Sequence, residues 1–410
     1  MNDDSPRATT ESQPRWRRTL SRLVDASAKE RMVISVAALV LAVAVGFVIV
    51  VLAGLAATCA TKATVLGVPT PLCYDPVAVY HELFLGAIGH PLSGNWTPLH
   101  FRMAVTLQNA TLLVFTGLAV AVSFRAGMFN IGVQGQMVLG ALAAALATIH
   151  LGGVAPSGVL GTLVLVPVGV LAGAVAGGLW GALPGALKAY ADANEVITTI
   201  MLNFVAANFA YVVVSSWFTP PDSSLVQTAN IPTAAYIPTV PFAFQPRDSF
   251  SLLGLLFAVA LVVGVAYLLA RTVFGYDLRA SGEQPEAAAY GGVSEKQTMV
   301  ASMTLSGALG GVGGAVLVMM VQGRWLANLP QLGFDGITVS ILAGNNPLGV
   351  GFAALLFGVL KSGSAAIGFG TDVPPSLVDV LRGLVILFVA MPEFFRMIGA
   401  SLGVGGDVDA

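Results

Sequence analysis

The stretch Phe124–Gln136, FRAGMFNIGVQGQ, interrupts two long apolar runs with glycines, amide side chains and one arginine. Lipid cannot form hydrogen bonds with loose backbone, so a polar, non-helical segment at membrane depth is stable only against protein or a water-filled cavity. Transporters build solute sites near the bilayer midplane from helices interrupted in this way. The stretch therefore predicts a membrane protein with a polar pathway through it or beside it.

The composition supports a membrane protein along the whole length. The chain has 410 residues, of which 56% are hydrophobic and 10% are charged, whereas soluble domains carry about 25% charged residues. Apolar runs long enough to cross a bilayer recur, which predicts an all-α polytopic protein with about ten transmembrane helices. The span at 336–345 is too short to cross unaided, so we expect it to be broken or re-entrant. The expected spans are 32–55, 103–123, 129–150, 158–183, 195–217, 251–270, 298–321, 336–345, 348–366 and 376–392.

The placement of Lys and Arg predicts the topology. Most of the 19 basic residues lie in the tail 1–31 or in alternate connections between spans. By the positive-inside rule, both termini are expected in the cytoplasm. The apolar run after the tail is longer than the core of a signal peptide, so we expect it to be retained as the first helix. The predicted divisions are a basic tail at 1–31, a membrane domain at 32–392 with outer segments 56–101 and 218–250 and a cytoplasmic loop at 271–297, and a cytoplasmic tail at 393–410.

The two cysteines, Cys59 and Cys73, both lie in the first outer segment. Disulfides persist outside the cytoplasm, but the sequence leaves open whether the two residues form a bridge or remain unpaired thiols. The outer segments themselves could be a docking surface for a delivered solute carrier or lids over helix ends.

Amide side chains at membrane depth are the candidates for the pathway. A buried amide without a partner is costly, so each must bond between helices or face a path. Interhelical bonds are favoured for Asn203 and Asn208. Asp379 and Arg382 share one helix face, and a structural ion pair is favoured for them although charges within a membrane suggest function. The candidate pathway residues are Gln108, Asn109, Asn130, Gln134, Gln136, Asn203, Asn208, Asn345 and Asn346.

The cytoplasmic loop FGYDLRASGEQPEAAAYGGVSEKQ, Phe274–Gln297, is the longest polar segment on the inner side. Within it Glu286–Tyr290 is predicted to form a short helix, with Pro285 at its start and Gly291 just past its end. Such a helix could press into a groove on a cytoplasmic partner. An ordinary connector is the simpler alternative on physical grounds.

Common enzyme motifs are missing from the sequence. There is no Gly-Lys dipeptide for a phosphate-binding loop, no H-E-x-x-H and no Gly-x-Ser-x-Gly. The four histidines lack metal-ligand spacing. We therefore expect a transport subunit that is not an enzyme, binds no metal or cofactor, and has no nucleic-acid partner.

Four segments together resemble permease subunits of bacterial ABC importers in the branched-chain amino acid, ribose and nucleoside group, and are most similar to nucleoside-type permeases. The resemblance implies the ABC importer permease fold in a bacterial cytoplasmic membrane. It also implies three protein partners: an ATPase that holds ATP-Mg, a second related permease in a heterodimer, and an extracytoplasmic substrate-binding lipoprotein. The segments are AGMFNIGVQGQ (126–136), ANEVITTIMLNFVA (193–206), LRASGEQPEAAAYGGV (278–293) and GFDGITVSILAGNNPLGV (333–350).

The resemblance also assigns roles to residues. It makes the cytoplasmic loop the ATPase-coupling segment, which reverses the simpler alternative above. The family usually has Glu where this chain has Gln134, and the loss of the carboxylate favours a neutral solute over ion coupling. The expected solute is a nucleoside, with a sugar or a branched-chain amino acid as the alternative. An ion-coupled secondary transporter using Asp335, Asp379 and Arg382 is the remaining rival. The expected coupling residues are Arg279, Ala280, Gly282, Glu283, Glu286, Ala287, Ala288, Tyr290 and Gly292.

Overall fold

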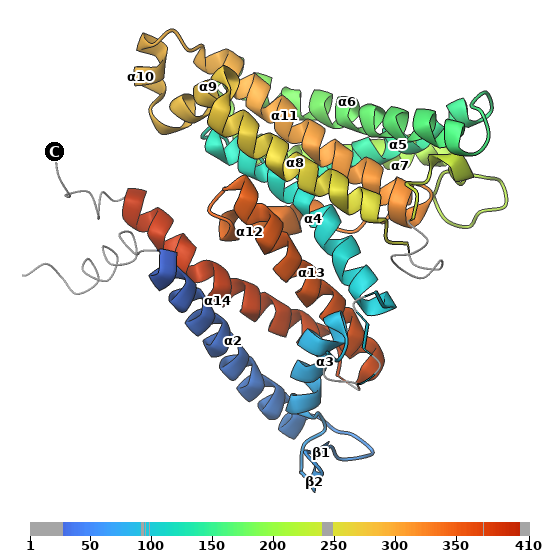
Figure 1. The fold of residues 1–410 in the computed structure, drawn as a ribbon, viewed down its shortest axis with the longest axis vertical. Helices are drawn as coiled ribbons and strands as arrows, with labels where there is room; N and C mark the ends of the chain where they lie inside the picture. The colour runs from blue at the N-terminus through green and yellow to red at the C-terminus, as the bar shows by residue number, and fades with distance from the viewer. Residues whose placement is uncertain are drawn as a thin grey trace, which may run out of the picture.

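Long helices make up most of the computed structural model, which describes residues 28–401 apart from 92, 93, 95, 98, 240–248 and 372. The predicted basic tail, except for its last residues, and the end of the C-terminal tail lie outside the described residues. The long helices are α2 (Ala28–Ala56), α4 (Phe101–Arg125), α5 (Val133–Gly152), α6 (Val159–Ala191), α7 (Glu195–Trp217), α8 (Leu252–Arg271), α11 (Glu295–Val316), α13 (Pro347–Gly370) and α14 (Pro375–Ser401) (Figure 1).

Eight helical stretches among the described residues are long and apolar enough to cross a membrane. They coincide with eight of the predicted spans, so the all-α polytopic fold is confirmed. The two other predicted spans correspond to α14 and to α12 (Leu332–Leu342), which has 11 residues. The eighth span is therefore short, as expected, and a non-helical segment at 323–331 precedes it. Helix α14 continues to Ser401, past the predicted end of its span at 392.

Short elements connect the long helices. The first outer segment contains a helix that the sequence did not predict, α3 (Pro76–Ile88), which begins where the Asp75 carboxylate accepts hydrogen bonds from the backbone N–H groups of Val77 and Ala78. Its apolar face then packs against α13, which explains how so short a helix is held. The remaining short elements are β1 (Thr64–Val65), β2 (Val68–Pro69), η1 (Thr233–Ala235), α9 (Val273–Glu283), α10 (Pro285–Tyr290) and the π-helical turn η2 (Leu317–Gln322).

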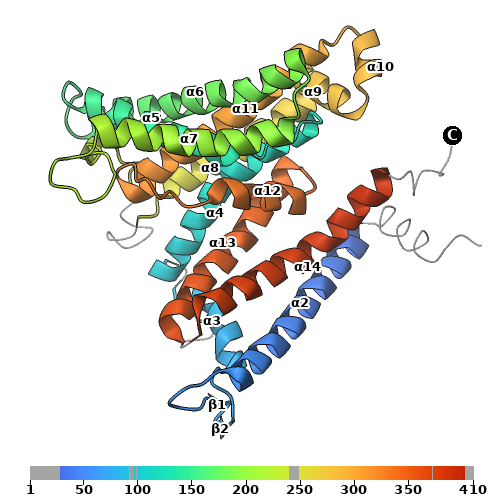
Figure 2. The ribbon, with the colours of Figure 1, turned by 180° about the vertical axis from the view of Figure 1, so that it is seen from behind.

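The helices pack around two hydrophobic clusters. The larger cluster lies among α4 to α8 and α11 to α13, and the smaller one joins α2, α3, α13 and α14. Figure 2 shows α2 and α14 side by side along one edge of the molecule. Helix α13 contacts both α3 and α4, so it connects the two groups.

Glycines allow α6 and α11 to approach backbone to backbone. A methyl group at Gly177 would overlap the carbonyl oxygen of Gly307, and one at Gly311 would overlap that of Gly173. Small residues serve this purpose in membranes, where close packing holds helices together. These glycines therefore pack the two helices directly against each other.

The two ends of the molecule differ in content. Helices α9 and α10, the beginning of α2 and the end of α14 lie on the left of Figure 1, whereas the β1–β2 hairpin lies at the bottom of the view, beyond the opposite end of α2. We call these the coupling end and the hairpin end. Cys59 and Cys73 form a disulfide at the hairpin end, so the bridged alternative is confirmed.

Candidate functional site

The polar break between α4 and α5 lies inside the bundle. Residues 126–132 are non-helical, and the Val133 side chain at the start of α5 approaches Gly310, near the middle of the α11–η2 stretch. Helix α5 therefore starts within the packed helices and not at their end. Its first backbone N–H groups have no partners within the helix, so other parts of the chain must supply them.

The Asn130 side chain holds the break in place through buried hydrogen bonds. Its side chain is fully buried, and its Nδ2 donates to Gln136 Oε1 at 3.0 Å and to Ser306 Oγ at 2.7 Å. Its Oδ1 accepts from Gly132 N at 2.9 Å and from Gln136 Nε2 at 3.2 Å. These bonds use both donors and both acceptor positions of the amide. Asn130 thus ties the break to α5 and α11.

Ser306, on α11, is a member of this network that the sequence analysis missed. Its hydroxyl donates to the carbonyl oxygen of Ala119 at 2.5 Å and so extends the network to α4. Ser306 comes directly before the α11 glycines that pack against α6, and a polar residue beside such a packing stripe is the signal that could have identified it.

Asn203, on α7, supplies one of the missing partners at the start of α5. Its Oδ1 accepts from the backbone N–H of Gly135 at 2.7 Å, and its Nδ2 donates to the carbonyl oxygen of Ile131 at 2.9 Å. The interhelical bonding predicted for Asn203 is confirmed.

Gln134 connects the break with a second interrupted element. Its Nε2 donates to the carbonyl oxygen of Pro330 at 3.2 Å, and its Oε1 accepts from the backbone N–H of Gly333 at 2.8 Å. The non-helical segment 323–331 also contacts α5, because Trp325 Nε1 donates to the carbonyl oxygen of Val138 at 3.2 Å. An uncharged amide therefore joins the beginnings of α5 and α12.

The structure brings four of the candidate pathway amides together at the break, namely Asn130, Gln134, Gln136 and Asn203, and places the others elsewhere. Near the hairpin end of α4, Gln108 Oε1 accepts from Ser249 Oγ at 2.7 Å, and Asn109 Nδ2 donates to the carbonyl oxygen of Val105 at 3.0 Å. In the turn between α12 and α13, Asn345 Oδ1 accepts from Ser340 Oγ, and Asn346 Oδ1 caps α13 through Leu348 N.

Asn208 is exposed on the far face of α7 and donates to the carbonyl oxygen of Phe204 in its own helix at 2.8 Å. The interhelical bond predicted for this residue is therefore wrong within this chain. Five residues along an α-helix correspond to a rotation that leaves Asn208 about 140° from Asn203, so the two side chains cannot face the same neighbour.

Asp335, Lys361, Asp379 and Arg382 form two ion pairs on α12, α13 and α14. Lys361 on α13 contacts Asp335 on α12, with 2.5 Å between Nζ and Oδ2. On α14, Arg382 Nη2 lies 3.3 Å from Asp379 Oδ1, which confirms the ion pair predicted there. The first pair was missed because its members belong to different helices.

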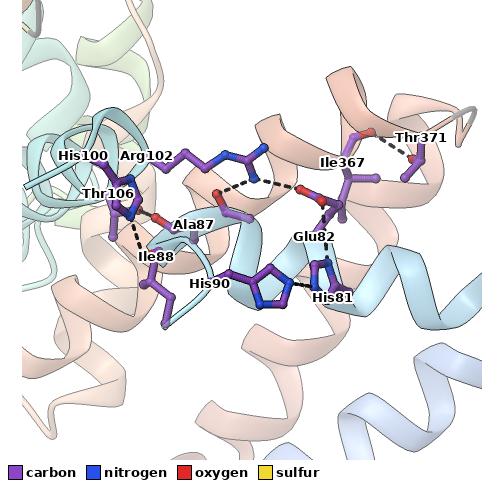
Figure 3. A network of polar contacts seen from close by, with 11 residues as sticks. His81, Glu82, Ala87, Ile88, His90, His100, Arg102, Thr106, Ile367 and Thr371 are labelled. Atoms are coloured by element: carbon purple, nitrogen blue, oxygen red, sulfur yellow. Dashed lines mark hydrogen bonds and ion pairs between the residues drawn. The ribbon is translucent and has the colours of Figure 1, made fainter. Parts of the chain in front are cut away.

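A polar network links α3 to the start of α4 (Figure 3). The Arg102 guanidinium donates to Glu82 Oε2 at 2.9 Å and to the carbonyl oxygen of Gly86 at 3.1 Å. The other oxygen of Glu82 lies 3.6 Å from His81 Nδ1, and His81 Nε2 contacts His90 Nε2. Across the described ranges, no group of three or more potential ligand side chains could hold a metal ion.

At the coupling end, α9 and α10 form a small helical pair that projects from the bundle (Figure 1). Tyr290 is 95% exposed, whereas Ala288 is buried. Ala288 can therefore position α10 but cannot itself meet a partner protein. The other expected coupling residues lie on or next to these two helices, with Glu283, Glu286, Ala287 and Gly292 exposed and Arg279, Ala280 and Gly282 partly buried.

Residues 103–390 match the family described as "Branched-chain amino acid transport system / permease component". The chain belongs to this family. The match covers α4 to most of α14 and leaves out α2, β1, β2 and α3. The family resemblance stated from four sequence segments is confirmed, and the chain is a multi-pass permease.

Several curated permeases are similar over most of their length. The nucleoside ABC transporter permease protein NupB of Lactococcus lactis is 32% identical over 78% of this chain and 84% of that protein. The guanosine ABC transporter permease protein NupP of Bacillus subtilis is 31% identical over 74% of this chain and 84% of that protein. A glucose ABC transporter permease of Haloferax volcanii is 32% identical over 78% of this chain and 82% of that protein.

Proposed function

We propose that this permease is one membrane subunit of an ATP-driven importer and that its solute is a nucleoside. The observation that carries the proposal is the exposed α9–α10 pair of a permease similar to nucleoside and guanosine permeases. A short helix with an exposed tyrosine suits the insertion of an anchor side chain into a groove on a partner. The cytoplasmic ATPase is that partner, and ATP-Mg binds to it and not to this chain.

The full importer contains two further proteins: a second related permease, and an extracytoplasmic lipoprotein that delivers the solute at the hairpin end. In this arrangement the coupling end faces the cytoplasm of a bacterial cell and the hairpin end faces outward. The Cys59–Cys73 disulfide supports this orientation because disulfides persist on the oxidising side of the membrane. ATP-driven closure of the ATPase pushes on α9–α10, and the helices then alternate between outward-open and inward-open states.

The uncharged side chains at the break support the proposal that the solute is neutral. Its four amides carry no charge, and their hydrogen bonds to each other and to the backbone keep the start of α5 in place. We propose that the solute passes beside this element, and the pathway roles of the other amides remain predictions. A nucleoside carries many hydrogen-bonding groups without a net charge, which fits such surroundings.

The test uses the complete transporter in proteoliposomes and follows the uptake of radiolabelled nucleosides. We expect uptake that requires ATP, and we expect deletion of Glu286–Tyr290 to abolish both uptake and solute-stimulated ATP hydrolysis while membrane insertion is retained. Uptake that persists in the deletion would refute the coupling role of α10.

A sugar is the second candidate solute, because the glucose permease is as similar to this chain as the nucleoside permease NupB. Competition between unlabelled compounds and the radiolabelled nucleoside in the same vesicles distinguishes a sugar from a nucleoside as the solute. Excess unlabelled nucleoside is expected to block uptake, and excess glucose or leucine is not. Uptake driven by an ion gradient in vesicles without the ATPase would instead support a secondary transporter.

A further inference from the structure

The C-terminal end of α9 packs directly on the connection between α4 and α5. A methyl group at Gly282 would overlap the carbonyl oxygen of Arg125 and would lie 2.8 Å from the backbone nitrogen of Gly127. A methyl group at Gly127 would in turn lie 3.2 Å from the Gly282 Cα atom. The two segments therefore meet backbone to backbone.

This contact depends on glycine on both sides. Gly127 has a φ of +72°, a conformation that other residues rarely adopt. Gly282 lies on α9, where its missing side chain leaves the room that the Arg125 carbonyl oxygen occupies. No flexible side chain lies between the two backbones, so a displacement of α9 cannot be absorbed by a change of rotamer.

The Gly127–Gly282 contact is connected to both interrupted elements of the membrane domain, the break before α5 and the turn after α12. Gly127 is separated by two residues from Asn130, which holds the start of α5. The neighbouring Arg125 Nε donates to the carbonyl oxygen of Asn345, in the turn between α12 and α13, at 3.0 Å. A shift at Gly127 therefore reaches the break and the α12–α13 turn together.

Helix α10, unlike α9, is mostly exposed. Ala288 is buried, whereas Glu286, Ala287 and Tyr290 are exposed, and the helix packs mainly on α9 and to a lesser extent on α11. The helix can be gripped by a partner, and its movement can reach the membrane domain through α9, its main neighbour, as well as through α11.

We propose that the Gly127–Gly282 contact transmits the movement of the ATPase into the membrane domain, with α10 as the part that is gripped and residues 126–132 as the part that moves. This inference rests on the proposed function and specifies how the coupling helices act on the pathway. Gly127 and Gly282 are positioning residues in this scheme, since neither touches the solute.

The first experiment compares Gly282→Ala with Gly264→Ala in the complete transporter. Gly264 lies on α8, and a methyl group there would meet nothing within 4 Å, so it is a matched control. For Gly282→Ala we expect uptake and solute-stimulated ATP hydrolysis to fall about fivefold to tenfold, while the ATPase still copurifies with the permease. Uptake equal to that of the wild type would overturn the proposal.

The second experiment needs no variant, so it stands even if Gly282→Ala fails to fold. Hydrogen exchange is measured on the wild-type transporter before and after the ATPase is trapped with ATP and vanadate. We expect the exchange rates of residues 126–132 to change by about fivefold or more on trapping. Unchanged exchange in a complex that performs ATP-dependent uptake would overturn this inference while leaving the proposed function intact. The absence of ATP-dependent uptake in the wild type would instead count against the proposed function.

Discussion

Asp335 and Lys361 join α12 to α13 through an ion pair in which only 31% and 26% of the two side chains are exposed. A charge that loses its partner in such a place is poorly solvated, whereas the loss of both charges leaves none to solvate. The pair therefore neutralises the two charges and holds the short helix α12 against its neighbour.

We expect Lys361→Met to lower the stability of the purified chain more than the double variant Lys361→Met/Asp335→Asn. Removal of one member of a fully buried pair costs about 3–5 kcal/mol, and the partial exposure here reduces that figure. Thermal unfolding in detergent, followed by tryptophan fluorescence, measures the difference. An equal loss in the single and double variants would contradict the expectation. Asp379→Asn, at a side chain that is 64% exposed, is the control and should change little.

Asn203→Ala is expected to destabilise the chain, and Asn208→Ala is not. The first substitution leaves the backbone N–H of Gly135 and the carbonyl oxygen of Ile131 without side-chain partners, at about 1–3 kcal/mol for each buried group. The second removes one bond within α7 on an exposed face. The thermal unfolding midpoints of the two variants decide the matter, and similar midpoints would show that the Asn203 bonds do not hold the start of α5.

Tyr290→Ala is expected to weaken binding of the ATPase by about thirtyfold, which corresponds to the loss of an exposed aromatic anchor worth about 2 kcal/mol. Tyr190→Ala is the matched control, because Tyr190 is also exposed but stacks under Lys296 at the end of α6. Affinity is measured between the permease in nanodiscs and the purified ATPase. A similar loss in both variants would indicate a general surface effect and would count against α10 as the part that is gripped.

The double variant Cys59→Ser/Cys73→Ser is expected to lose about 3 kcal/mol of stability, the chain-entropy value for a loop of this length, since the two cysteines are 14 residues apart. Wild-type protein purified without a reducing agent should show no free thiol toward a maleimide until it is denatured and reduced. Maleimide labelling of the native, unreduced protein would contradict the bridge. The unfolding midpoint with and without reductant measures the energetic effect.

The sequence was sufficient for the approximate limits of eight of the ten predicted spans, because a uniform lipid environment makes hydrophobicity a direct guide to depth. The sequence was less informative where a helix or a side chain depends on the residues from elsewhere in the chain that contact it. Helix α3 was missed because its stability comes from packing on α13. Helix α5 begins four residues after the predicted span limit at 129, since Asn130 bonds with Gln136 and Ser306 instead of continuing the helix.

The candidate site was predicted only in part, and the reason is the same. Hydrophobicity identifies an amide at membrane depth but not the face of the helix on which it lies, so Asn203 and Asn208 received the same prediction and differ in the structure. The pairing of Lys361 with Asp335 and the contact between Gly127 and Gly282 depend on how helices distant in sequence come together, and the period of a single helix carries no such information.

The uncharged amides at the break have an electrical consequence. Movement of a full charge across the membrane is worth about 2.3 kcal/mol per 100 mV. Asn130, Gln134, Gln136 and Asn203 carry no charge, and Asp335 and Lys361 neutralise each other, so displacement of these elements transfers no net charge through the electric field. With a neutral solute, we therefore expect the movement of these residues to add no voltage dependence to the rate of transport.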